Sequence, residues 1–224
     1  MKKFTFGLML AAVALFAASP LFAEGMMFGV KGGVNMANLS GDDVSNTKSR
    51  TVFMGGAFMS YNISEIFAIQ PELLYAMKGA AADIPDFDAS LNLSYIEIPI
   101  LFKVNLPTEG KIKPSLYAGP SIGFLMSAEA DSAGTTMDIK DYAKSTDYGI
   151  IAGGSLGYQM GNGGLLFLEA RYEIGLTSIA EKGFSLIGED VEDLTEEELA
   201  ALAEVEPDIK NSGFSIMVGY GFAF

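Results

Sequence analysis

Residues 211–224 read NSGFSIMVGYGFAF, and the alternation within them decides the fold. Every second position is large and apolar: Phe214, Ile216, Val218, Tyr220, Phe222 and Phe224. The positions between them are small or narrow, and none of these residues from Phe214 onward is charged. Because successive side chains of a strand point to opposite faces, one face is bulky and apolar and the other is small. This pattern favours a strand that turns its large residues to lipid and lines a narrow barrel with small ones, although the last strand of a soluble sandwich is an alternative.

Similar alternation recurs in seven earlier segments of the chain. These are residues 28–35, 53–61, 67–78, 95–104, 114–126, 148–159 and 166–176. The connections between the eight segments alternate between long and short, as in outer-membrane barrels. A strand of about 11 residues at a tilt of about 40° spans about 28 Å, close to the apolar band of such barrels. The sequence therefore predicts an all-β, eight-stranded antiparallel up-and-down transmembrane barrel.

Four prolines lie within or at the start of these segments: Pro71, Pro99, Pro114 and Pro120. Proline cannot donate a hydrogen bond to the ladder, and a closed barrel has no free edge on which it would be harmless. We therefore expect bulges or local gaps in the ladder at these positions.

The amino terminus has the three regions of a secretory signal peptide. Lys2 and Lys3 precede an apolar run over residues 4–18, and a small residue, Ala23, precedes the expected cleavage point. We expect residues 1–23 to be removed and residues 24–224 to form the barrel domain. No other stretch reaches the ~18 apolar residues of a membrane helix. Yet 50% of the residues are hydrophobic, with a mean hydropathy of +0.30, so the apolar residues are spread in alternation.

The overall composition excludes several classes of function. The chain carries 28 acidic and 14 basic residues, which disfavours nucleic acid as a partner because phosphates require a basic face. It has no cysteine, so neither a disulfide framework nor a thiolate metal site is expected. It also has no histidine, the commonest general base. We therefore expect no cofactor and no enzymatic activity.

The predicted inner face carries a set of charged residues. They are Lys31, Glu72, Lys78, Glu97, Lys103, Glu169, Arg171 and Glu173. An eight-stranded barrel is only wide enough to be filled by side chains, so such charges must pair or meet trapped water. One interpretation is a salt-bridge plug that holds the barrel shut, with Arg171 paired to at least one of the glutamates. The other is a path for protons or ions, or a latent pore.

The last connection contains an acidic stretch, residues 188–208. Within it Thr195 is followed by three glutamates and an apolar run, which is typical of a capping box that opens a short helix. The stretch is a candidate for cation binding or for docking a protein. The alternative is a solvated charged loop, because the regular oxygen spacing of a calcium loop is missing.

Several of these segments resemble the outer-membrane β-barrel domain of the PorT family. The resemblance lies in IQPELLY at residues 69–75, in YIEIP at residues 95–99, in AGP at residues 118–120 and in the opening GVKGGVN at residues 29–35. It covers essentially the whole chain after residue 23, and it implies that the prolines are tolerated. The family's namesake is linked to protein secretion across the outer membrane.

The carboxy terminus is similar to the signal that outer-membrane barrels present to the barrel assembly machinery. The residues that carry this similarity are Gly219, Tyr220, Phe222 and Phe224. We therefore expect an outer-membrane protein with both termini in the periplasm, whose partners are lipid, the assembly machinery and a surface or secretion-system protein. Its expected role is structural or interaction-bearing. A small ion or solute channel and an exported soluble lipocalin-like binder are the alternatives.

Overall fold

The computed structural model describes residues 25–44, 47–82, 89–132, 134–161, 163–181 and 207–223. The expected signal peptide, the helix expected after Thr195 and the terminal Phe224 lie outside these residues. Eight long strands make up the structure: β1 (Met26–Ser40), β3 (Arg50–Asn62), β4 (Phe67–Ala82), β5 (Ala89–Asn105), β6 (Ile112–Ser132), β8 (Thr146–Gln159), β9 (Gly164–Gly175) and β10 (Lys210–Ala223). Three short elements accompany them: β2 (Thr47–Lys48), β7 (Thr135–Asp138) and the 3₁₀ turn η2 (Lys140–Tyr142).

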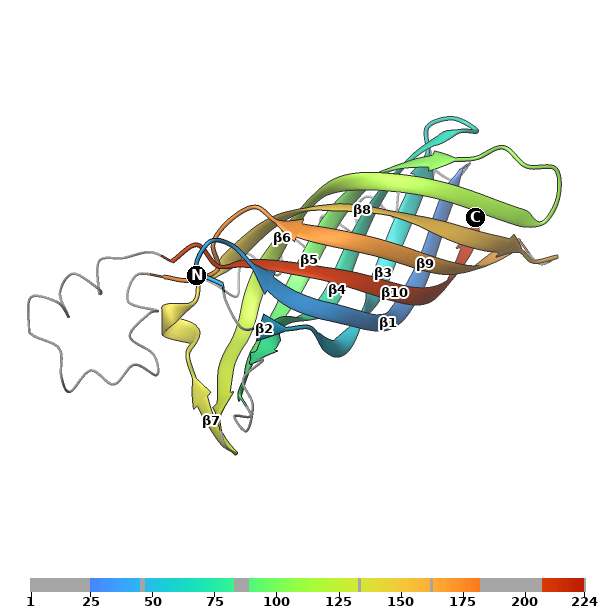
Figure 1. The fold of residues 1–224 in the computed structure, drawn as a ribbon. Helices are drawn as coiled ribbons and strands as arrows, with labels where there is room; N and C mark the ends of the chain where they lie inside the picture. Colours follow the sequence, from blue (N-terminus) through green and yellow to red (C-terminus); the bar gives the residue numbers. More distant parts are fainter. Residues whose placement is uncertain are drawn as a thin grey trace, which may run out of the picture.

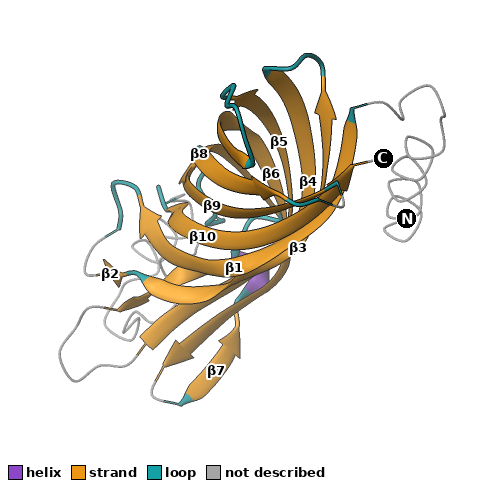
Figure 2. Cartoon of the chain, turned by 90° about the vertical axis from the view of Figure 1, so that its right-hand side faces the viewer, coloured by secondary structure: helices purple, strands orange, loops and turns teal. Residues whose placement is uncertain are grey.

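The long strands close into a barrel (Figures 1 and 2). Each pairs antiparallel with the next along the chain, and β10 returns to pair with β1, where Met27 lies opposite Ala223. The connections after β3, β5 and β8 are short, and they lie at the same end of the barrel as this pair. The predicted eight-stranded up-and-down barrel is therefore confirmed.

The two faces of the wall are sorted as the alternation predicts. On β10, the outward Val218 is 56% exposed, whereas the neighbouring inward Met217 is 1% exposed. Large apolar side chains cover the outside of the other long strands as well, Phe53 and Leu168 among them. A lipocalin-like soluble barrel would need a polar exterior, so that alternative is wrong. Within the described ranges, no helix has the length and apolarity to span a membrane.

Three of the four strand prolines coincide with interruptions in the ladder. Pairing stops between β3 and β4 beside Pro71, between β4 and β5 beside Pro99, and between β5 and β6 beside Pro120. Each ladder resumes in the same register, so these are the expected gaps rather than bulges. Pro114 lies in continuous pairing with Leu156, and the expectation there is wrong.

The one register shift recorded between paired strands lies elsewhere, between Ser94 and Tyr95 of β5. Beyond this shift, the region after β6 differs from the plain long connection that the sequence predicts between the segments at residues 114–126 and 148–159. Instead β6 continues to Ser132, and β7 pairs back on it as an exposed hairpin that projects beyond the barrel (Figure 1). The turn that follows brings Ile139 to the interior, where it is 1% exposed.

Candidate functional site

The barrel interior brings together the charged residues of the predicted inner face. Seven of the eight are buried: Lys31, Glu72, Lys78, Glu97, Glu169, Arg171 and Glu173. The eighth, Lys103, is partly buried near the short-turn end of β5. Burying an ion costs several kcal/mol unless partners compensate for the lost water, so the contacts of each group decide what the site is.

One cluster, the Glu72 group, forms around the carboxylate of that residue. Lys31 Nζ lies 2.6 Å from Glu72 Oε1 and 2.8 Å from Glu169 Oε1. Arg171 Nη1 lies 2.9 Å from Glu72 Oε2, and Gln70 Nε2 donates to Glu72 Oε1 at 2.7 Å. Two cations therefore face two carboxylates, and both oxygens of Glu72 accept charge-assisted hydrogen bonds.

Lys103 lies at the edge of the Glu72 group rather than inside it. Its Nζ donates to Gln70 Oε1 at 3.4 Å, a long hydrogen bond, and it reaches Glu72 only through that amide. The sequence places Lys103 on the correct face, but the amide of Gln70 is the contact that links it to the cluster.

A second cluster, the Lys78 group, lies nearer the long-loop end. Lys78 Nζ lies 2.5 Å from Glu173 Oε1, 3.0 Å from Glu97 Oε2 and 3.6 Å from Asp147 Oδ2. Asn211 Nδ2 donates to Asp147 Oδ2 at 2.8 Å. One cation thus faces three carboxylates, so this group is richer in negative charge than the Glu72 group.

The Lys78 group also holds buried oxygens without a hydrogen-bond partner. They are both carboxylate oxygens of Glu97, Oδ1 of Asp147 and Oδ1 of Asn211. The Lys78–Glu97 contact is an ion pair by distance, but its angles are not those of a hydrogen bond. Glu97 is therefore the most weakly supported carboxylate of the interior.

These ion pairs cross the lumen instead of following one strand. Strands β4 and β9 lie opposite each other, four strands apart in either direction around the barrel. The pairs Arg171–Glu72 and Lys78–Glu173 both join these two walls. An eight-stranded barrel is narrow enough for such side chains to meet. The two groups therefore connect opposite walls of the barrel through its interior.

An apolar cluster, the apolar cap, packs at the long-loop end of the barrel beyond the Lys78 group. Its buried members come from β5, β6 and the connections that follow β6 and β9: Leu93, Tyr95, Leu125, Ala128, Ile139, Ala143 and Ile179. Backbone hydrogen bonds hold the two connections together, with Lys144 N donating to Ile179 O at 2.7 Å and Glu181 N donating to Tyr142 O at 2.9 Å. The cap therefore places packed hydrocarbon next to the Lys78 group, with the centroid of the Tyr95 ring 5.4 Å from Lys78 Nζ.

The carboxylates of the two groups are engaged with cations. Every inward carboxylate of the two groups lies beside a cation, and none lines an open cleft. Among the described residues, no three acids or other ligating side chains are disposed to hold a metal ion. The chemistry that the interior supports is the mutual neutralisation of buried charge.

The residues of the expected assembly signal divide between the two faces. Gly219 lies inward, where an added Cβ would meet Phe167 Cζ at 2.3 Å. Tyr220 and Phe222 lie outward with their ring centroids 5.8 Å apart. The pattern of small and large residues at this terminus thus serves the packing of the barrel wall, whatever it contributes to assembly.

Several interior residues do not appear in the charged set predicted from the sequence. Asp147 lies on the same inward face of β8 as Gly149, but it comes just before the segment at residues 148–159 that the sequence predicts as a strand. Gln70 and Asn211 are uncharged, and Ile139 and Ile179 lie in connections without alternation. Extending the alternation of the segment at residues 148–159 by one residue would have assigned Asp147 to the interior. No alternating pattern in the sequence indicates that Ile139 and Ile179 are buried.

Comparison with known proteins agrees with this geometry. Neisserial surface protein A has 15% identity over 90% of this chain and 98% of its own, with a TM-score of 0.52. The outer membrane protein OprG from Pseudomonas aeruginosa has 11% identity over 88% of this chain and 95% of its own, with a TM-score of 0.50. At these identities the likeness concerns the fold alone. No curated protein sequence matches the chain.

A family model described as "Outer membrane protein beta-barrel domain" matches residues 16–181. The match spans most of the chain and includes β1 through β9. It agrees with an apolar outer wall around a charged interior. The match with this family model does not test whether the chain belongs to the PorT family in particular. The chain therefore belongs to the family of outer-membrane β-barrel domain proteins.

Proposed function

We propose that this protein is a closed, non-enzymatic barrel of the outer membrane that acts through its surface-exposed loops. The observation that carries the proposal is the set of buried ion pairs that cross the lumen, with the apolar cap beyond them. The Glu72 and Lys78 groups connect opposite walls at two levels, and the apolar cap packs at the long-loop end. A barrel whose lumen is occupied can contact a partner through its outer surface and its loops.

The absence of catalysis is part of this proposal. General acid–base catalysis requires a group that can exchange protons with a bound substrate. Glu72, Glu169 and Glu173 are each held by a lysine or arginine inside a filled barrel. Their arrangement supports a structural role for the charges.

The proposed orientation has the short turns and both termini in the periplasm. The hairpin of β6 and β7 and the 3₁₀ turn η2 would then face the outside of the cell. In β7, Thr135 to Asp138 are all exposed, and Met137 is 58% exposed. This projecting hairpin is the part of the described surface best suited to meet another protein. On the PorT resemblance, we propose a component of protein secretion as that partner.

Recording in planar bilayers tests the closed lumen. Folded protein, identified by heat-modifiable migration on a gel, is expected to give no steady conductance. The alternative function, a small channel, is favoured by the buried oxygens of the Lys78 group that have no hydrogen-bond partner. Steady conductance in the parent protein would establish that alternative and overturn our proposal.

Crosslinking in intact cells tests the surface role. The parent is compared with a variant whose residues 132–138 are replaced by a short Gly-Ser turn, which leaves the wall below intact. Loss of a defined crosslinked protein in the variant alone is the expected result. An identical pattern of crosslinks in both proteins would rule out the hairpin as the contact.

A further inference from the structure

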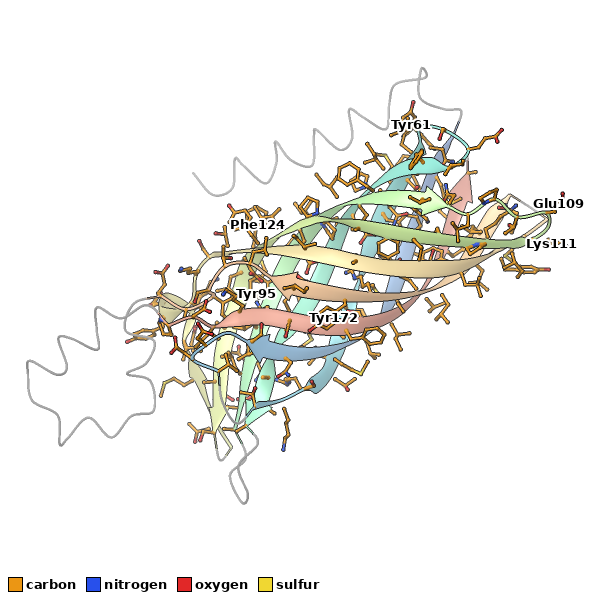
Figure 3. The ribbon with its side chains drawn as sticks, turned by 45° about the horizontal axis from the view of Figure 1, so that its top comes forward. Tyr61, Tyr95, Glu109, Lys111, Phe124 and Tyr172 are labelled. Atoms are coloured by element: carbon orange, nitrogen blue, oxygen red, sulfur yellow. The ribbon has the colours of Figure 1, made fainter. Side chains whose placement is uncertain are left out.

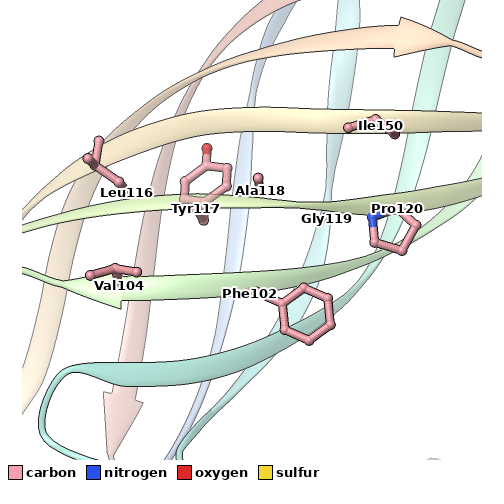
Figure 4. A pocket seen from close by; sticks show the side chains of 8 residues that line it. All are labelled: Phe102, Val104, Leu116, Tyr117, Ala118, Gly119, Pro120 and Ile150. Carbon is pink, nitrogen blue, oxygen red and sulfur yellow. The ribbon is translucent and has the colours of Figure 1, made fainter.

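The outer wall carries two adjoining apolar hollows. The first, about 680 Å³, is lined on β5, β6 and β8 by Phe102, Val104, Leu116, Ala118, Pro120 and Ile150 (Figure 4). The second, about 340 Å³, continues over β6, β8 and β9 and is lined by Pro114, Leu116, Leu156, Leu168 and Ala170. Leu116 lines both hollows, so its side chain is the ridge between them.

The two hollows form because small outward residues lie next to one another on neighbouring strands. Ala118 pairs with Ala152, and Gly154 pairs with Ala170. Larger side chains such as Phe102 stand around them. The first hollow also lies where the β5–β6 ladder is interrupted beside Pro120. Both hollows are therefore built into the wall by the choice of residues.

Positive charge lies directly below the hollows. The connection between β5 and β6 ends in Lys111, which Figure 3 shows with Glu109 at the tip of the barrel. Lys111 Nζ lies 5.9 Å from the centroid of the Tyr158 ring, which faces outward on β8. Nearby, Lys113 Nζ donates to the Thr108 carbonyl at 3.2 Å.

The other two short turns lack such a lysine. The turn after β3 has Glu65 as its charged residue, and the turn after β8 has no charged residue in its sequence. Of the three short turns, the one below the two hollows is thus the one that carries a lysine, Lys111, together with Glu109. A cation at the membrane boundary beside Tyr158 is well placed to meet an anionic headgroup.

We propose that this face binds one diacyl phospholipid with an anionic headgroup. One acyl chain lies in each hollow on either side of Leu116, and the phosphate lies beside Lys111. Two adjoining apolar hollows separated by Leu116, with Lys111 toward the short-turn end, match a ligand with two chains and one charged head. The site lies on the outside of the wall, so it does not depend on whether the lumen is closed.

Photolabelling tests the position of the chains. The folded protein is reconstituted in nanodiscs that contain phosphatidylglycerol with a diazirine near the end of an acyl chain, and labelled peptides are mapped by mass spectrometry. We expect labelling to concentrate on the hollow-lining parts of β5, β6, β8 and β9, in excess over the outward residues of β1 and β10. Uniform labelling around the wall would overturn the proposal.

Filling the hollows provides the matched comparison. Ala118→Leu and Ala170→Leu place bulk in the first and second hollow and should lower the excess labelling. Ala57→Leu adds the same bulk to an outward alanine of β3 and should leave labelling unchanged. Heat-modifiable migration verifies that each variant is folded. Equal labelling in all three variants would contradict a shaped site. A dimer mass for the reconstituted protein, with little lipid labelling on this face, would assign the face to a second copy.

Competition with unlabelled lipid tests the headgroup. Phosphatidylglycerol should compete better than phosphatidylcholine against the labelled lipid. Lys111→Gln should weaken that preference about fivefold, the factor expected for one surface lysine. Lys48→Gln, on the exposed β2 at the opposite end of the barrel, is the control. Equal competition by the two lipids in the parent would overturn the proposal.

Discussion

Arg171 of β9 and Glu72 of β4 pair across the barrel, with Nη1 2.9 Å from Oε2. Both side chains are buried, and their strands lie on opposite walls. The guanidinium keeps its charge inside the lumen, so it needs a carboxylate partner there. Arg171 also lies 2.9 Å from Met54 Sδ through Nη2, a weak acceptor that does not offset its charge.

Removing Arg171 should therefore destabilise the barrel strongly. Arg171→Ala leaves Glu72 with one cation fewer, and breaking a buried pair costs about 3–5 kcal/mol. The measurement is the urea midpoint of unfolding with lipid present. Lys48→Ala, at an exposed position of β2, should lie within about 0.5 kcal/mol of the parent. Equal midpoints for all three proteins would show that the cross-lumen pair contributes nothing.

The two glutamates that flank Lys78 should respond differently to neutralisation. Glu173→Gln removes the 2.5 Å contact to Lys78 and should cost about 3–5 kcal/mol. Glu97→Gln removes a charge whose oxygens lack hydrogen-bond partners, and it relieves repulsion among three carboxylates. We therefore expect it to be neutral or stabilising in the same unfolding experiment. A larger loss for Glu97→Gln than for Glu173→Gln would contradict this account of the Lys78 group.

Adjacent glycines of β1 should differ in their tolerance of a methyl group. A Cβ on Gly33 would lie 2.0 Å from Ile216 O of β10, and backbone cannot move aside cheaply. Gly33→Ala should therefore cost about 1–3 kcal/mol, as overpacking does. On Gly32, the nearest atom to a Cβ is 3.8 Å away, so Gly32→Ala should be harmless. Heat-modifiable migration against temperature compares the two; equal behaviour would refute the close approach of β1 and β10.

The apolar cap should control access to the lumen. Ile179→Ala leaves a cavity among the residues that cover the barrel, at a cost of about 2–5 kcal/mol. Because the chain has no cysteine, Ser121→Cys provides a single thiol inside the barrel. Its reaction with a polar thiol reagent should accelerate about tenfold or more when Ile179→Ala is added, since local opening follows local stability.

A thiol at Thr136→Cys on the exposed β7 controls for reagent activity. It should react at the same rate with and without Ile179→Ala. If the Ser121→Cys thiol is already as reactive as this surface thiol in the otherwise unchanged protein, the cap does not seal the lumen.

Much of the barrel wall could be predicted from the sequence, because the face on which a side chain lies depends on its immediate neighbours along the strand. Alternation with a period of two follows from strand geometry, and a lipid exterior leaves charge only one side on which to lie. Residues as far apart as Lys31 and Arg171 could therefore be assigned inward from their immediate neighbours. Three of the four prolines likewise indicated where the ladder would be interrupted, because a missing donor is a property of the residue itself.

The tertiary structure alone decided which charges meet. Along β9, Arg171 has Glu169 and Glu173 two residues away, yet the carboxylate in contact with it is Glu72 on the opposite wall. The barrel's closure sets how far each strand is shifted against the next, and that shift fixes which residues share a level in the lumen. The cap over the lumen has the same origin. Ile139 and Ile179 lie in connections without periodicity, and they become buried only because the closed barrel brings two distant loops together.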